Sequence, residues 1–163
     1  MPMRRNCRIT QFLEMKLVVD NDIFFAEVER LLDAGDAITI KVRGVSMMPL
    51  LRDGVHSVIL RRHKDVDIKL GAVMFFCYRG RWFMHRLLKI EGDVLCFAGD
   101  GNYKQWECVS RSDVKGVVTA VVSRSGRVKD CDSLSWRVKS KIWLMLPPIV
   151  RRYILAIIRR VKF

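Results

Sequence analysis

"AVMFFCYRGRWFMHRLLKIEGDVLCFAGDGN" occupies residues 72–102 and consists of three apolar runs separated by short glycine turns. The runs are rich in β-branched and aromatic residues, a composition typical of strands, and they cover 72–78, 81–90 and 93–99. Gly80 and Gly92 can adopt the positive φ angles that tight hairpins need. The stretch therefore predicts three strands that form an antiparallel meander.

Further strand-like runs lie on both sides of this stretch, at 37–43, 56–62 and 114–122. Six short strands with turns at close intervals indicate a mainly β fold, either a coiled antiparallel sheet or a partly open barrel. Before them, "NDIFFAEVERLLDAGD" at 21–36 has apolar residues at helical spacing and Gly35 as a C-cap. We expect an amphipathic helix whose packing face comprises Ile23, Phe24, Val28, Leu31 and Leu32.

The C-terminal segment carries most of the positive charge. The chain has a net charge of +13, and residues 133–163 hold eight Lys and Arg residues and no Asp or Glu. Around "RRYILAIIRRVKF" at 151–163, one helical face comprises Val150, Tyr153, Ile154, Ile157, Ile158 and Val161. Two interpretations stay open: a basic amphipathic helix in an anionic membrane interface with Trp143 as its anchor, or a helix docked on its own domain or on a partner.

Composition and cysteine spacing bear on domain organisation and location. We expect an N-terminal helical segment, a β domain and a basic C-terminal tail, at 1–36, 37–130 and 131–163. The five cysteines form no CxxC pair, which indicates reduced thiols and neither a zinc site nor a complete disulfide framework. Glu14 and Lys16 interrupt the first apolar run, so no signal peptide or N-terminal membrane span is expected. We therefore expect a protein without metal or cofactor that is cytoplasmic or peripheral at the membrane.

Ser46 lies in "GVSMMPLL" at 44–51, between a glycine turn and an apolar segment. A serine in this setting is either a hydroxyl satisfied by the backbone or a nucleophile, and a nucleophilic serine needs a base to take its proton. Of the three histidines, His63 lies in a charged turn and His56 begins a strand, so both are expected at the surface or a strand edge. Only His85 lies in the middle of a strand.

His85 shares a strand face with Phe83 and Leu87, which fits either a satisfied core histidine or a general base. Asp100 follows on a glycine-flanked turn directly after the next strand. Hairpin geometry can return this turn towards His85, where a carboxylate would fix the imidazole tautomer. The alternative is that Asp100 is simply a turn former.

The order of these motifs resembles that of the S24/S26 serine peptidase superfamily. The quoted set is G-x-S-M-x-P-x-L from Gly44, then "DVDIKLGAVMFF", "HRLLKIEGD", "AGDGN" and "SDVKGVV". Within the superfamily, the chain is most similar to type I signal peptidases of the archaeal and endoplasmic-reticulum kind, over about Ile38 to Val122. The resemblance implies the coiled antiparallel sheet of that superfamily, in agreement with the strand pattern.

The resemblance also implies roles for individual residues. Ser46 maps to the nucleophile, His85 to the base in an "HR" motif, and Asp100 to the orienting aspartate. The substrate would be a peptide or protein segment in extended conformation, with a substrate-binding segment formed by Gly44, Met47, Met48 and Pro49. The position that often supplies a second oxyanion donor is Gly44, so that donor is unassigned, and Glu107 is given no role.

We therefore expect a serine endopeptidase that removes a leader or propeptide from a dedicated substrate. Without an N-terminal span, a general secretory signal peptidase is disfavoured. The alternative is a catalytically silent protein of the same fold that binds a peptide, a membrane or nucleic acid, of which nucleic acid is disfavoured. A LexA-like self-cleaving regulator is also disfavoured, because only about 35 residues precede the sheet and the base is a histidine.

Overall fold

The computed structural model describes residues 21–161. The expected absence of a signal peptide and the thiol of Cys7 therefore lie outside the described residues. The three helices in this range are α1 (Asn21–Asp33), α2 (Leu134–Met145) and α3 (Pro148–Arg160). Two short 3₁₀ turns, η1 (Asp65–Asp67) and η2 (Arg111–Asp113), connect strands.

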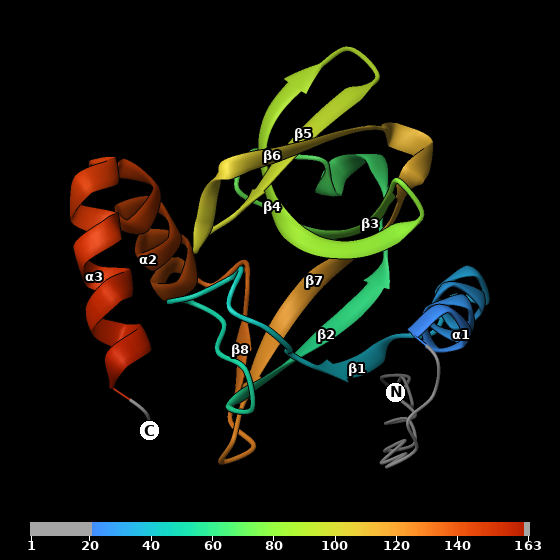
Figure 1. Ribbon diagram of the computed structural model, residues 1–163. Helices are drawn as coiled ribbons and strands as arrows, with labels where there is room; N and C mark the ends of the chain where they lie inside the picture. The colour runs from blue at the N-terminus through green and yellow to red at the C-terminus, as the bar shows by residue number, and fades with distance from the viewer. Residues whose placement is uncertain (1–20, 162–163) are drawn as a thin grey trace, which may run out of the picture.

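The body of the molecule is one antiparallel sheet of eight strands, in which the order β1-β2-β7-β3-β4-β5-β6 is joined by β8 pairing with β7. The strands are β1 (Ile38–Lys41), β2 (His56–Arg62), β3 (Val73–Tyr78), β4 (Arg81–Glu91), β5 (Val94–Gly99), β6 (Asn102–Ser110), β7 (Val114–Ser123) and β8 (Val128–Asp130). The sheet curls strongly but its two end strands do not pair, and α1 lies at the opposite side from α2 and α3 (Figure 1). The mainly β prediction is confirmed.

Two hairpins form as the sequence predicts. Arg79 and Gly80 both have positive φ, at 51° and 72°, which is the backbone of the two-residue turn that matches the natural twist of paired strands. Gly92 turns the chain between β4 and β5 with a φ of 60°. The turns bring β3, β4 and β5 together in sequence order, with Met74 opposite His85.

Apolar side chains fill two adjoining parts of the core. One part joins α1 to β1, β2 and β7, where Leu32, Leu60 and Val58 are fully buried. The other lies within the β3–β6 meander, where the stacked rings of Phe76 and Phe97 have centroids 4.2 Å apart. The predicted packing face of α1 is confirmed only in its second half. Its first turn exposes the apolar residues Ile23 and Phe24.

The sequence pattern missed β6, and this strand changes the interpretation of two cysteines. Cys96 on β5 lies directly opposite Cys108 on β6, their Cα atoms are 4.1 Å apart, and the two sulfurs form a disulfide. The expectation that all cysteines are reduced is therefore wrong for this pair. Cys77 and Cys131 are free, and burial raises the pKa of the Cys131 thiol to about 12, which keeps it protonated and unreactive.

The C-terminal helices pack against the β domain. Trp143 is 5% exposed and its indole Nε1–H donates to the Asp100 carbonyl oxygen at 3.0 Å. It packs with Met48 and Leu155 in a small apolar cluster. Trp143 therefore anchors the helices to their own domain, which agrees with the second of the two interpretations and not with a place for Trp143 in a membrane interface. Within residues 21–161, no helix combines the length and apolar character that crossing a bilayer requires.

Candidate active site

Ser46 lies in an irregular turn between β1 and β2 that is held at both ends. Gly44 adopts a φ of 80°, and its N–H donates to the Asp53 carboxylate at 3.0 Å. On the other side, Met47 and Met48 are buried, and the peptide bond between Met48 and Pro49 is cis. Ser46 itself is half-buried, between an exposed residue and a buried one.

The Ser46 turn rests directly on the connection between β5 and β6. The Gly101 N–H donates to the Ser46 carbonyl oxygen at 2.7 Å. At Gly99 the approach is so close that a Cβ atom would lie 2.4 Å from that same oxygen and 3.3 Å from Nε2 of His85. Gly99 is thus the point where the Ser46 backbone and the His85 imidazole meet.

His85 is almost completely buried, and one of its ring nitrogens is held by a carboxylate. Nδ1 lies 2.9 Å from Oε2 of Glu107, and the two side chains are 5% and 1% exposed. A carboxylate oxygen accepts hydrogen bonds, so Nδ1–H donates, and in the neutral form of the imidazole the lone pair is on Nε2. That lone pair is on the nitrogen beside Gly99 and the Ser46 turn. His85 thus has the orientation that a general base requires.

Asp100 does not orient His85, and this corrects the role predicted from sequence. Both of its carboxylate oxygens accept hydrogen bonds from the Arg86 guanidinium, at 2.7 and 2.6 Å. Neighbouring residues on a strand point to opposite faces of the sheet. His85 and Arg86 therefore need carboxylates on opposite faces, and Asp100 lies on the face of Arg86.

Glu107 is the functional candidate that the sequence pattern missed. Glu107 lies on β6, the last strand in the sheet order. It pairs with Phe97 on the neighbouring strand β5. In this strand the buried positions are Glu107 and Val109, so a carboxylate stands where alternation leads one to expect an apolar side chain. The signal available in the sequence was the spacing of two residues between the buried positions of β6. The charge of Glu107 at one of these positions obscured that signal.

The predicted substrate-binding residues divide into two groups. Met47 packs in the main core and Met48 against Trp143 and Leu155, so both side chains are buried rather than exposed in the predicted substrate-binding segment. Gly44 is exposed and Pro49 is half-buried, on either side of Ser46. These two remain available to a bound chain.

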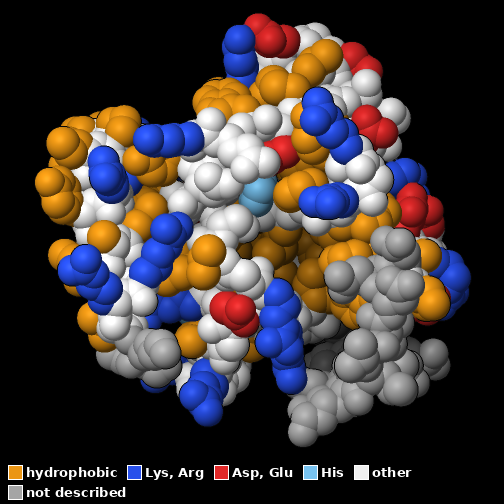
Figure 2. Space-filling model, in the orientation of Figure 1, with side chains coloured by type: hydrophobic (Ala, Val, Ile, Leu, Met, Phe, Trp, Pro, Cys, Tyr) orange, Lys and Arg blue, Asp and Glu red, His pale blue; other side chains and the backbone are white. Residues whose placement is uncertain are grey.

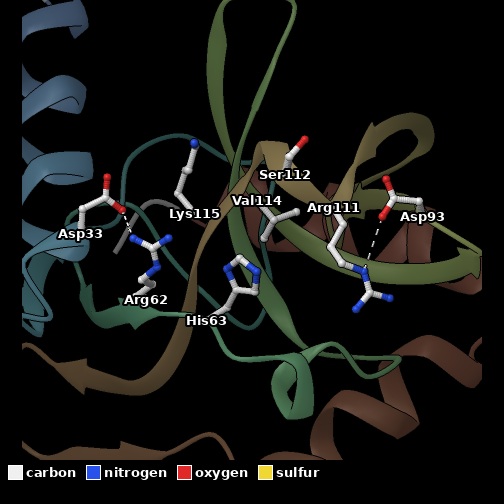
Figure 3. Close-up of a pocket in the computed structure, with 8 residues that line it drawn as sticks. All are labelled: Asp33, Arg62, His63, Asp93, Arg111, Ser112, Val114 and Lys115. Carbon is white, nitrogen blue, oxygen red and sulfur yellow. Dashed lines mark hydrogen bonds and ion pairs between the residues drawn. The ribbon is translucent and has the colours of Figure 1, made fainter.

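The other two histidines differ from expectation in their surroundings. Nδ1 of His56 accepts the Arg52 backbone N–H at 3.0 Å, and burial with the nearby Arg52 charge lowers its pKa. His63 is half-buried, and burial is also the main cause of its lowered pKa. Its side chain lies in a cavity of about 350 Å³ that is lined by Asp33, Arg62, His63, Asp93, Arg111, Ser112, Val114 and Lys115 (Figure 3).

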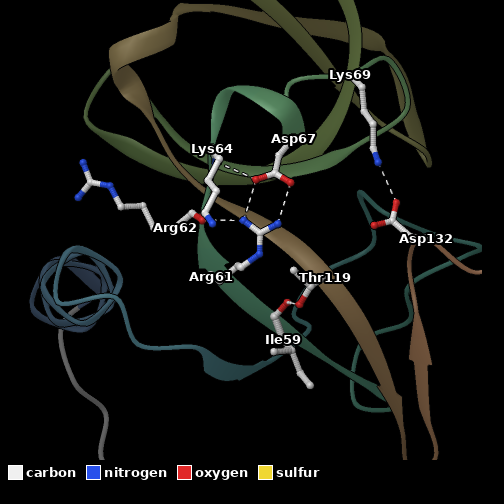
Figure 4. Close-up of polar contacts among 8 residues, drawn as sticks. All are labelled: Ile59, Arg61, Arg62, Lys64, Asp67, Lys69, Thr119 and Asp132. Carbon is white, nitrogen blue, oxygen red and sulfur yellow. Dashed lines mark hydrogen bonds and ion pairs between the residues drawn. The ribbon is translucent and has the colours of Figure 1, made fainter. Parts of the chain in front are cut away.

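This cavity is separate from the Ser46–His85 site, since it shares no lining residue with it. Its charges are largely neutralised in pairs: Arg62 with Asp33, and Arg111 with Asp93 (Figure 3). The adjacent Arg61 points away from Arg62 and donates two hydrogen bonds of 2.7 Å to Asp67 of η1 (Figure 4). The surroundings of the cavity are therefore those of a structural ion-pair network.

In comparisons with known proteins, no family model matches the chain, and none of the curated proteins or solved structures matches it. Among the residues that the structure describes, no group of three or more His, Cys, Asp or Glu side chains could hold a metal ion.

Replacing Gly99 by alanine should disrupt the site through its backbone. Because the added Cβ would lie 2.4 Å from the Ser46 carbonyl oxygen, the Ser46 turn must move away from His85. We expect Gly99→Ala to lower the free energy of unfolding by about 2 kcal/mol or more, measured by denaturant titration. The control is Gly126→Ala, which places alanine at a φ of 79° in open space and should cost only about 1 kcal/mol. Equal losses in both variants would contradict close contact at Gly99.

The Arg61–Asp67 pair should make stability depend on pH. The Arg61 guanidinium lowers the pKa of Asp67, so the stabilisation is complete above the ordinary carboxyl pKa of about 3.9 and is lost as the pH falls through the lower folded value. We expect Asp67→Asn to cost about 1 kcal/mol at pH 7 and to flatten the loss of stability at acid pH, measured by urea unfolding. Asp132→Asn, at an exposed pair with Lys69, should change little (Figure 4). A wild-type pH dependence in Asp67→Asn would exclude this assignment.

Proposed function

We propose that the protein is a serine endopeptidase in which Ser46 is the nucleophile and His85 the general base. The observation that carries the proposal is the buried His85–Glu107 hydrogen bond of 2.9 Å, made by the nitrogen opposite to the one that faces Gly99 and the Ser46 turn. The resemblance of the Ser46, His85 and Gly99 segments to S24/S26 peptidases supports the same roles. Glu107 replaces Asp100 as the positioning carboxylate.

In the proposed reaction, Ser46 Oγ attacks the carbonyl carbon of a peptide bond while Nε2 of His85 takes the hydroxyl proton. The Nδ1–H bond to Glu107 stabilises the imidazolium that forms. The tetrahedral intermediate collapses, and the imidazolium gives its proton to the departing amine as the C–N bond breaks. Water then hydrolyses the serine ester, with His85 again acting as the base, and this step releases the acid and restores Ser46.

The position of β1 favours an extended peptide as substrate. β1 is an end strand of the described sheet order, and the chain runs directly from it into the Ser46 turn. A bound peptide could add to this edge through backbone hydrogen bonds and bring one carbonyl to Ser46. A leader or propeptide, which is extended and accessible before removal, has the required shape.

Replacement of Ser46 tests the reaction directly. We expect the full-length protein to cut some members of a proteome-derived peptide library, with the new termini identified by mass spectrometry, and Ser46→Ala to produce none of these cuts. The matched control is Ser112→Ala, which alters a serine of the separate cavity and should leave the cuts unchanged. Cleavage by Ser46→Ala at the wild-type rate would overturn the proposal. Peptide binding without cleavage by the wild type would favour the silent binding protein instead.

Replacement of Glu107 tests its positioning role. We expect Glu107→Gln to lower kcat about 10² to 10⁴-fold with little change in KM on a substrate from that library, because the imidazolium loses its carboxylate. Glu107→Asp should recover part of the rate. Glu91→Gln, an exposed glutamate on β4 paired with Lys89, serves as the control and should keep full activity. A change in KM alone, or no rescue by aspartate, would assign Glu107 a purely structural role.

A further inference from the structure

Helices α2 and α3 each present an apolar stripe to solvent. On α2 the stripe follows helical spacing and comprises Leu134, Val138, Ile142 and Met145. On α3 the corresponding side chains are Ile149, Tyr153 and Ile157. Each of these seven side chains is between 46% and 77% exposed. Apolar side chains gathered in this way on a protein surface indicate an interaction site.

These stripes make no core contact within residues 21–161. The α2 residues that face the domain are Trp136, Ser140 and Trp143, which lie on the opposite side of the helix from the stripe. On α3 the domain-facing residue is Leu155. The helices therefore have one apolar face for their own domain and a second one that the described chain leaves open.

Positive charge surrounds the open face. Residues 133–161 contain no Asp or Glu, and their basic residues are Arg137, Lys139, Lys141, Arg151, Arg152, Arg159 and Arg160. In Figure 2, Lys and Arg side chains alternate with apolar ones over the side of the molecule formed by α2 and α3. A face that combines apolar and basic side chains is complementary to a surface with negative headgroups above an apolar layer.

A small basic cavity lies between α3 and the start of β6. It has a volume of about 210 Å³ and is lined by Gly101, Asn102, Tyr103, Lys104, Arg152, Leu155 and Arg159. Three of these side chains are cationic and none is a carboxylate. The Arg159 guanidinium also donates to the Gly101 carbonyl at 3.2 Å, which holds it at the cavity. The size and charge suit a phosphate-bearing headgroup.

We propose that α2 and α3 form a docking face for an anionic lipid surface. The apolar stripes enter the boundary between headgroups and acyl chains, and the flanking Lys and Arg side chains bind the phosphates. Nucleic acid would engage the same charges but would leave the seven apolar side chains in water, so lipid is the better match. The inference does not depend on catalysis, since none of these side chains belongs to the Ser46–His85 site.

Vesicle co-sedimentation of the full-length protein tests the docking face. We expect binding to phosphatidylcholine vesicles that contain phosphatidylglycerol, and much weaker binding to phosphatidylcholine alone. Ile142→Ser with Ile157→Ser should weaken binding at least tenfold, because two exposed apolar side chains no longer enter the lipid. The matched control is Val66→Ser with Leu70→Ser, which removes two apolar side chains that are at least as exposed from another surface and should leave binding unchanged.

Several outcomes would overturn the lipid assignment. Equal loss in both double variants would show a non-specific apolar effect. Salt-sensitive binding to DNA without binding to vesicles would assign the face to nucleic acid, and a dimer that Ile142→Ser with Ile157→Ser dissociates would assign it to a second copy of the chain. Ser46→Ala should bind vesicles as the wild type does, so a failure of the peptidase proposal and a failure of this one are distinguishable.

Discussion

The buried ion pair between Arg86 and Asp100 is the interaction on which the rest of the structure depends. Each side chain is 1% exposed, and Arg86 also donates to the Gly71 carbonyl at 2.7 Å. Removing one partner of such a pair leaves an uncompensated charge in the core, which typically costs about 3–5 kcal/mol. The pair fixes the turn between β5 and β6, and both the Ser46 turn and the C-terminal helices attach to that turn.

Three separate contacts join other segments to this turn. The Gly101 N–H holds the Ser46 carbonyl, the Trp143 indole holds the Asp100 carbonyl, and the Arg159 guanidinium reaches the Gly101 carbonyl. The Ser46 turn and the C-terminal helices are therefore attached to the same turn. On β4, His85 is the neighbour of Arg86 and points to the other face of the sheet, where it bonds to Glu107. Strand alternation thus lets two adjacent residues bind separate carboxylates on opposite faces of the sheet.

Much of the fold could be predicted because its strands follow the simple rules of burial. The meander from β3 to β5 consists of apolar runs between glycine turns, and the structure has strands there within one residue of the expected limits. β6 escaped prediction because a carboxylate occupies one of its two buried positions. The sequence predicted the wrong partner for Asp100 for a related reason. The turn sequence places a carboxylate near the His85–Arg86 segment, but the strand register and the face of the sheet decide which of the two side chains it reaches.

The Cys96–Cys108 disulfide acquires a particular significance from its position. Cys108 is the residue next to Glu107, on a strand at the end of the sheet where backbone pairing exists on one side only. A covalent link one residue from Glu107 ties this edge strand to β5 independently of the backbone hydrogen bonds. Disulfides persist in oxidising compartments, and reduction of this bond would leave β6 attached to β5 by non-covalent contacts alone.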